Sequence, residues 1–150
     1  MRMTDRLYDK DFNLWIERES KYLRNGNTEK LDLENILEEI EALGKRDRRA
    51  LESQIVRLLH HLLKWVKRPE RRGSSWQLTI INSRDEISKL LEDSPSLEKK
   101  IESLFEKCYT SAVKNAMVET GLKKKDFPKE SSWSLREILE EDFWPEVLNC

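Results

Sequence analysis

Apolar residues recur at intervals of three and four along most of the chain, which is the spacing of one helix face. The longest stripe keeps a single phase and predicts one helix over about residues 33–67, although Gly44 lies inside it and Asp47 offers an alternative restart. Asp32 suits the start of this helix, and Pro69 forces its end because the residue before proline avoids helical backbone. The stripe consists of Leu33, Ile36, Leu37, Ile40, Leu51, Ile55, Leu58, Leu62 and Val66.

A shorter stripe precedes this long helix. It ends at Gly26, a residue suited to a left-handed cap. Its apolar face consists of Tyr8, Phe12, Trp15, Ile16, Tyr22 and Leu23. Further along the chain, Ser74 or Ser75 is predicted to cap a third helix, and its stripe includes Trp76.

The C-terminal half carries two more helical signals. Ser94-Pro95 predicts an N-cap with proline at the first helical position, and Gly121 closes the fourth helix. Ser134 and Glu137 have the spacing of a capping box for a last short helix, which is expected to end near residues 143–145.

These elements predict one all-α domain over residues 1–150, with a core from about 5 to 146. The architecture is a bundle of four main helices plus a short C-terminal helix. The chain has only 4 glycines and 4 prolines, too few for a turn-rich β protein. No segment approaches the roughly 20 apolar residues that a membrane span needs, so no membrane association is expected.

The cysteines and the N-terminus indicate a cellular location. Cys108 falls in an apolar stripe, where a packing role is expected, and Cys150 is the last residue. The two therefore do not form a disulfide framework, which favours the reducing cytoplasm. The first ten residues have no apolar run behind their charges and do not resemble a signal peptide.

Several motifs in this order make the chain resemble the bacterial domain of unknown function family 29. The resemblance extends from Tyr8 to Pro145. It implies a compact all-helical protein, found largely as a stand-alone bacterial chain, and it brings no activity or catalytic residues. The motifs are Leu31-Asp-Leu-Glu-Asn-Ile-Leu-Glu-Glu-Ile-Glu41, His61-Leu-Leu-Lys-Trp65, Pro69-Glu-Arg-Arg72, Ser75-Trp76-Gln-Leu-Thr79-Ile80, Leu91-Glu-Asp-Ser-Pro95 and Glu141-Asp-Phe-Trp-Pro145.

A basic, aromatic turn over residues 64–76 is the first candidate binding site. Arginine forks suit phosphate, and an open indole can stack on a base. Cations at the end of a long helix also oppose its negative dipole end, so a purely structural role is the alternative. The candidate phosphate or nucleic-acid ligands are Lys67, Arg68, Arg71, Arg72, Trp76 and Arg84.

An acidic run provides the second candidate, because Glu34, Glu38 and Glu41 share one side of the long helix. Such carboxylates can bind a divalent cation for a hydrolase. Acidic residues near a helix start also favour its positive dipole end, and the chain lacks Glu-x-x-His pairs. We therefore expect a solvated face and no metal or other cofactor.

The third candidate is an interior polar network. Polar groups that face a core need partners. Five polar side chains fall inside or beside the predicted apolar stripes and could meet: Glu19, Asp47, Arg48, His61 and Arg84. The alternatives are a buried structural network, a stripe that leaves the core near residues 44–50, and a pocket in which His61 acts as an acid or base.

These observations predict binding rather than catalysis. The 28 basic and 29 acidic residues leave a net charge of −1, which predicts no polyanionic partner overall. Long amphipathic helices leave apolar strips for a partner or a copy. The sequence therefore favours a protein-interaction or self-associating module without catalytic activity. Nucleic-acid or phosphate binding and a metal-dependent hydrolase are the alternatives.

Overall fold

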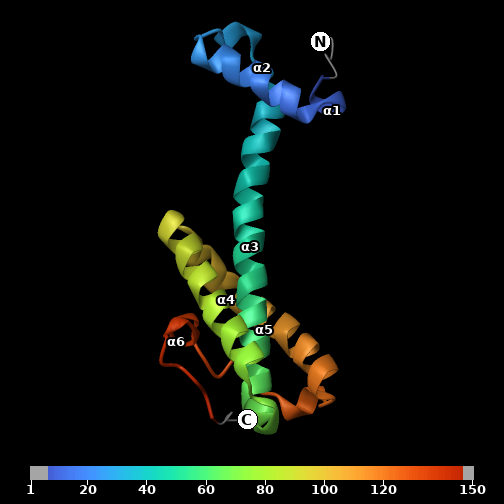
Figure 1. Cartoon of the computed structure of the whole chain (residues 1–150), viewed down its shortest axis with the longest axis vertical. Helices are drawn as coiled ribbons and strands as arrows, with labels where there is room; N and C mark the ends of the chain where they lie inside the picture. The colour runs from blue at the N-terminus through green and yellow to red at the C-terminus, as the bar shows by residue number, and fades with distance from the viewer. Residues whose placement is uncertain (1–6, 147–150) are drawn as a thin grey trace. The chain divides into compact units, whose positions relative to one another are not determined.

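The computed structural model describes residues 7–146, and within this range every regular element is a helix. The prediction of an all-α fold with four main helices and a short C-terminal helix is confirmed. The α-helices are α1 (Leu7–Lys10), α2 (Phe12–Arg24), α3 (Leu33–Lys67), α4 (Ser74–Asp93), α5 (Leu97–Thr120) and α6 (Leu135–Leu139) (Figure 1). Short 3-10 helices cover Thr28–Lys30, Pro69–Arg71 and Lys124–Asp126.

Helix α3 confirms the prediction of one continuous helix. It contains 35 residues, which at 1.5 Å per residue makes it roughly 50 Å long. Gly44 lies inside it with no break in the helix, and Pro69 follows its end at Lys67. The unbroken phase of the apolar stripe was therefore a better guide than the glycine.

Contacts within the chain define two compact units, the first ending at Lys45 and the second beginning at Arg46. One domain over residues 1–150 stays a prediction. In the first unit, Trp15, Leu31 and Glu19 are buried. The indole of Trp15 also packs edge-on against Tyr8, with ring centroids 4.7 Å apart. This unit therefore has a small interior built around one tryptophan.

The second unit contains the main core. The second half of α3 lies alongside α4 and α5 (Figure 1), and the buried side chains of these helices and of the C-terminal segment form one cluster. Cys108 belongs to it, which confirms the packing role expected for that residue; Cys150 lies outside the described residues. On α3 the buried apolar residues are Leu51, Ile55, Leu58, Leu59, Leu62, Leu63 and Trp65.

Three predicted helix ends are confirmed. Gly26 and Gly121 adopt left-handed backbone with φ of 72° and 75°, as their predicted capping roles require. The Ser134–Glu137 capping box forms, because each side chain accepts a hydrogen bond from the other residue's backbone N–H, at 3.2 and 3.1 Å.

The predicted caps of α4 and α5 are wrong by one or two residues. Gly73 is the N-cap of α4, and its extended backbone places Ser74 and Ser75 within the first helical turn. Ser94 closes α4 by donating its backbone N–H to the carbonyl of Leu90 at 3.0 Å. It therefore does not start α5, whose N-cap is Ser96.

The predicted end of the last helix is also wrong, because α6 stops at Leu139 instead of near residues 143–145. Glu140 has extended backbone, and a turn follows in which the N–H of Phe143 donates to the carbonyl of Glu140 at 3.1 Å. None of the helices within residues 7–146 has the length and apolarity that crossing a membrane requires.

Candidate functional site

The apolar stripe of α3 changes its environment along the helix. Leu51, the first stripe residue of the second unit, is fully buried. In the first unit Ile36 of the stripe is half-buried, whereas Leu33, Leu37 and Ile40 are 56–62% exposed and the neighbouring Leu43 is 55% exposed. We call this exposed set the apolar face, and it consists of Leu33, Leu37, Ile40 and Leu43.

Helix α2 also exposes apolar side chains in the first unit. Of the face predicted from its sequence, Trp15 is buried, whereas Phe12, Ile16 and Leu23 are exposed. Scattered apolar residues are normal on a protein surface, but contiguous sets mark interaction sites. The first unit therefore offers an apolar surface that its own residues do not cover.

The carboxylates proposed for metal binding do not gather around a common point. Glu34, Glu38 and Glu41 are exposed on α3. Within residues 7–146, no three His, Cys, Asp or Glu side chains lie close enough to hold a metal ion. The neighbouring Asp32 has a structural role, since its Oδ2 accepts hydrogen bonds from Trp15 Nε1 at 3.0 Å and from Asn35 Nδ2 at 2.7 Å.

Glu19 fixes the junction that precedes α3. Its Oε1 accepts from the backbone N–H of Asp32 at 2.6 Å, and its Oε2 pairs with Arg18 Nε at 3.0 Å. Glu19 is buried, as predicted, and a buried carboxylate needs hydrogen-bond donors. Asp32 and Arg18 of the same unit supply them.

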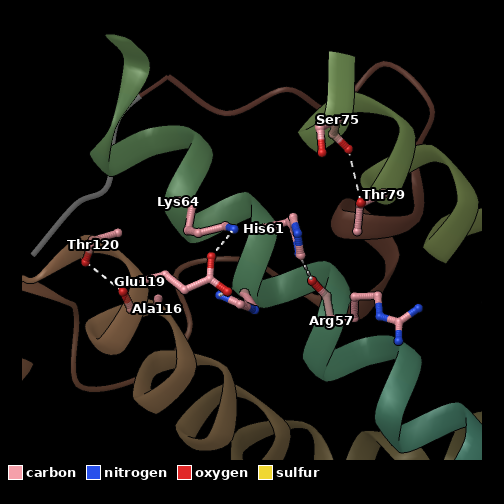
Figure 2. Close-up of polar contacts among 9 residues, drawn as sticks. Arg57, His61, Lys64, Ser75, Thr79, Ala116, Glu119 and Thr120 are labelled. Carbon is pink, nitrogen blue, oxygen red and sulfur yellow. Dashed lines mark hydrogen bonds and ion pairs between the residues drawn. The ribbon is translucent and has the colours of Figure 1, made fainter. Parts of the chain in front are cut away.

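The other four members of the predicted network have separate surroundings. Asp47 is exposed and Arg48 is half-buried. The Nδ1 of His61 lies 2.9 Å from the carbonyl of Arg57, one turn earlier on α3 (Figure 2). The structure therefore joins none of these three to Arg84, whose partners lie in the C-terminal segment.

Arg84 on α4 anchors that segment. Its Nε donates to the carbonyl of Ile138 at 2.7 Å, and its NH2 donates to the carbonyl of Phe143. The guanidinium also lies 5.2 Å from the ring centre of Trp144. Burial lowers the pKa of Arg84, and the nearby Glu141 opposes this shift. Because it is only 4% exposed and each of its three nitrogens donates to a backbone carbonyl of the C-terminal segment, Arg84 is not free to bind phosphate.

Most of the basic turn also holds the fold together. Arg68 NH2 donates to the carbonyl of Thr120 at 2.7 Å. Arg72 Nε donates to the carbonyl of Trp65 at 2.7 Å, and its guanidinium stacks over that indole. Lys67 lies over the ring of Phe127 at 5.8 Å. These contacts match the structural reading of the turn.

Two members of the turn differ from the rest. The ring of Trp76 is half-buried beneath Lys64 Nζ, 4.7 Å away, so this indole is not an open stacking platform. Arg71 is exposed. The geometry thus leaves one exposed arginine here rather than a set of converging phosphate ligands.

A buried lysine connects α3 to α5 in the second unit. Lys64 Nζ lies 2.5 Å from Glu119 Oε2, although Lys64 is only 4% exposed (Figure 2). The hydrogen bond from Lys64 lowers the pKa of Glu119. His60 Nε2 lies 3.5 Å from the other oxygen of Glu119. Burial lowers the pKa of His60 to about 4, so the ring is neutral at pH 7 and this contact is not an ion pair.

A hollow of about 510 Å³ lies beside this cluster and is lined by His60, His61 and Cys108 among other residues. Burial raises the pKa of the Cys108 thiol to about 11, so it is protonated at pH 7. A thiol becomes a strong nucleophile only as a thiolate. The hollow therefore combines two histidines with an inactive thiol and lacks an activated nucleophile of this kind.

The model of one protein family, described as domain of unknown function DUF29, matches residues 7–144. The chain belongs to the DUF29 family. This confirms the resemblance drawn from the motifs between Tyr8 and Pro145. No curated protein and no solved structure matches the DUF29 chain.

Sequence reasoning missed the contact between Lys64 and Glu119 in this DUF29 chain. His60 and Lys64 are four residues apart on one helix, and that spacing is readable from the sequence. Glu119 follows 55 residues after Lys64, and nothing local marks it as the partner. The sequence left open a stripe that leaves the core near residues 44–50, but it did not indicate which half of α3 is exposed, because the apolar periodicity is the same in both halves.

Proposed function

We propose that this chain is a protein-interaction module of the bacterial cytoplasm that self-associates through the apolar face and has no catalytic activity of its own. The exposure of Leu33, Leu37, Ile40 and Leu43 carries the proposal. The bacterial setting rests on the family, and the cytoplasmic setting on a buried free thiol without a disulfide partner among residues 7–146.

The apolar face is large enough to matter energetically. Full burial of one Leu or Ile side chain is worth about 1.5–3 kcal/mol, and the four side chains are 55–62% exposed. Covering what remains on two copies, eight side chains in all, would therefore contribute about 7–14 kcal/mol. Association itself costs about 4–15 kcal/mol. The two ranges overlap, so burial of the apolar face is of the size needed to offset the cost of forming a dimer.

Sedimentation velocity over about 1–300 µM would test this proposal on the full chain. We expect the sedimentation coefficient to rise with concentration for the natural sequence. Replacing Leu37→Glu together with Ile40→Glu should keep the chain monomeric, because burying two carboxylates in an interface is unfavourable. Circular dichroism would check that this variant remains helical.

Val118→Glu is the matched control, because Val118 is an apolar residue on α5 that is 85% exposed and lies outside the apolar face. It should leave self-association unchanged. A natural chain that stays monomeric throughout the range would overturn the proposal. So would a Leu37→Glu, Ile40→Glu chain that associates as the natural one does.

A further inference from the structure

A second hollow lies in the second unit, lined by the C-terminal half of α5 and by the segment that follows this helix. Its volume is about 650 Å³, which is within the range of pockets that hold one drug-sized molecule. Every residue that lines it falls within 109–129, so the hollow is formed entirely inside that unit. It shares no lining residue with the hollow beside His60.

The floor of this hollow is apolar and is held in place by contacts of the chain itself. Tyr109, Val113 and Met117 are spaced by four residues, so they share one side of α5. Phe127 and Pro128 add apolar lining from the following segment. The Tyr109 hydroxyl donates to the carbonyl of Pro128 at 2.7 Å, which ties this segment to the helix. The shape of the hollow is therefore set before any ligand binds.

The floor offers little hydrogen bonding to the body of a ligand. Two hydroxyls line the hollow, and both donate within the chain: Tyr109 to Pro128, and Thr110 to the carbonyl of Glu106 at 3.0 Å. Apart from its lysines, the remaining side chains of the lining are apolar. A polar group placed on this floor would lose its water without gaining a good partner. A hydrocarbon body therefore suits the hollow best.

Exposed lysines give the hollow a positive charge that no carboxylate of its lining balances. None of their ammonium groups forms an ion pair with the part of the chain that the structure describes. The nearby Asp126 does not line the hollow, and its Oδ2 accepts the backbone N–H of Lys123 at 2.8 Å. Because like charges repel, an anion among these ammonium groups is favourable. The four lysines are Lys114 on α5 and Lys124, Lys125 and Lys129 on the following segment.

We propose that this hollow binds a small amphipathic anion, namely a hydrocarbon chain that ends in one carboxylate. The hydrocarbon lies on the apolar floor, and the carboxylate lies among the lysines. The attraction is local, since the whole chain has a net charge of −1. This ligand site goes beyond self-association and does not depend on it, because the apolar face belongs to the other unit.

Isothermal titration calorimetry of the full chain with decanoate tests the proposal. We expect one site with a Kd of about 10–100 µM. Decanol has the same hydrocarbon without the charge and should bind about tenfold more weakly or worse. Butyrate has the same carboxylate on a short chain and should not bind detectably at about 1 mM. A natural chain that does not bind decanoate, or that binds decanol or butyrate as tightly, would overturn the proposal.

Charge reversal at the hollow tests where the carboxylate binds. Lys124→Glu together with Lys125→Glu should raise the Kd for decanoate by about tenfold or more. The matched control is Lys99→Glu together with Lys100→Glu, because these lysines are also adjacent and exposed but lie at the other end of α5. Both pairs change the net charge equally, so the control should keep the natural Kd within about twofold. Equal Kd values for the two chains would overturn the proposal.

The chain carrying Leu37→Glu and Ile40→Glu separates this site from the apolar face. It should bind decanoate with the natural Kd, and loss of binding would place the ligand on the apolar face and overturn the proposal. A chain that binds decanoate as expected but stays monomeric would overturn self-association alone. A chain that self-associates but does not bind decanoate would overturn the ligand site alone.

Co-sedimentation with phosphatidylglycerol vesicles tests whether the lysines meet a membrane surface instead of a free molecule. We expect no binding of the full chain to these vesicles. Vesicle binding that is lost with Lys124→Glu and Lys125→Glu, in a chain that does not bind decanoate, would make this segment a membrane-docking surface and overturn the proposal.

Discussion

Replacing Arg84→Met should destabilise the second unit by about 3 kcal/mol, a large effect for one substitution. Arg84 is 4% exposed, and its guanidinium binds the carbonyls of Ile138 and Phe143 on the segment that closes over the core. Methionine keeps much of the apolar stem and removes the donors. The change therefore tests the hydrogen bonds more than the packing.

The magnitude follows from those bonds. A hydrogen bond that involves a charged group contributes about 1.5–3 kcal/mol net, so the two short bonds would give about 3–6 kcal/mol if neither carbonyl found another partner. The third contact, from NH1 to the carbonyl of Glu141 at 3.4 Å, is long and adds little. Phe143 is only half-buried, so water can reach its carbonyl in the variant. We therefore expect a value near the lower end.

Urea denaturation followed by tryptophan fluorescence would measure this loss, since Trp65, Trp133 and Trp144 lie in or against the core of the second unit. Amide hydrogen exchange should show that residues 138–143 lose protection first. Arg136→Met is the matched control, because Arg136 lies on α6 with a side chain that is 85% exposed.

The control should cost no more than about 0.5 kcal/mol, as exposed ion pairs contribute little. If Arg84→Met also falls within about 0.5 kcal/mol of the natural chain, the carbonyl contacts do not hold the C-terminal segment, and the role assigned to Arg84 is wrong.

Three further predictions concern other buried groups. Burial lowers the pKa of His60 to about 4, so below pH 6.5 the unfolded chain takes up a proton that the folded chain does not, and the free energy of unfolding falls as the pH falls. His60→Gln should therefore reduce the loss of unfolding free energy between pH 8 and pH 5 by about 1 kcal/mol, after allowance for solvent screening. Urea titrations at both pH values would measure this difference. Equal pH profiles would contradict this. Burial also raises the pKa of the Cys108 thiol to about 11. A chain carrying Cys150→Ser should therefore react with a thiol reagent at pH 8 only after urea is added, and rapid labelling of the folded chain would refute this prediction. Asp32→Ala removes the acceptor of Trp15 Nε1 and should lower the stability of the first unit by about 1–2 kcal/mol, measured by amide exchange of residues 12–24; unchanged exchange would count against that role.

The helices were predictable because their signals are local and repeated. The stripe from Leu33 to Val66 contains nine apolar residues in one phase, and that agreement outweighed a single glycine. The prediction of a helix cap rests on only one or two residues, and the prediction for Ser94 was wrong for this reason. A serine between two helices can close the first or open the second, and here it closes α4.

The partners of polar residues were less predictable than the residues themselves. Glu19 and Arg84 were recognised as polar groups at buried positions, and both are buried. Arg84, however, meets carbonyls that follow it by 54–59 residues. Backbone acceptors are present at every residue, so no pattern in the sequence indicates which carbonyl an arginine will bind. The shared network was predicted by joining polar residues to one another, whereas the structure gives Glu19, His61 and Arg84 separate partners.

The link between Arg84 and Ile138 also has a consequence in time. Ile138 is synthesised 54 residues after Arg84, which at about 5–20 residues per second corresponds to roughly 3–11 s on a translating ribosome. During those seconds α4 can already be helical, but its arginine must remain hydrated because its carbonyl acceptors do not yet exist. This guanidinium therefore cannot exchange its water for those carbonyls until the chain has been made at least to Ile138.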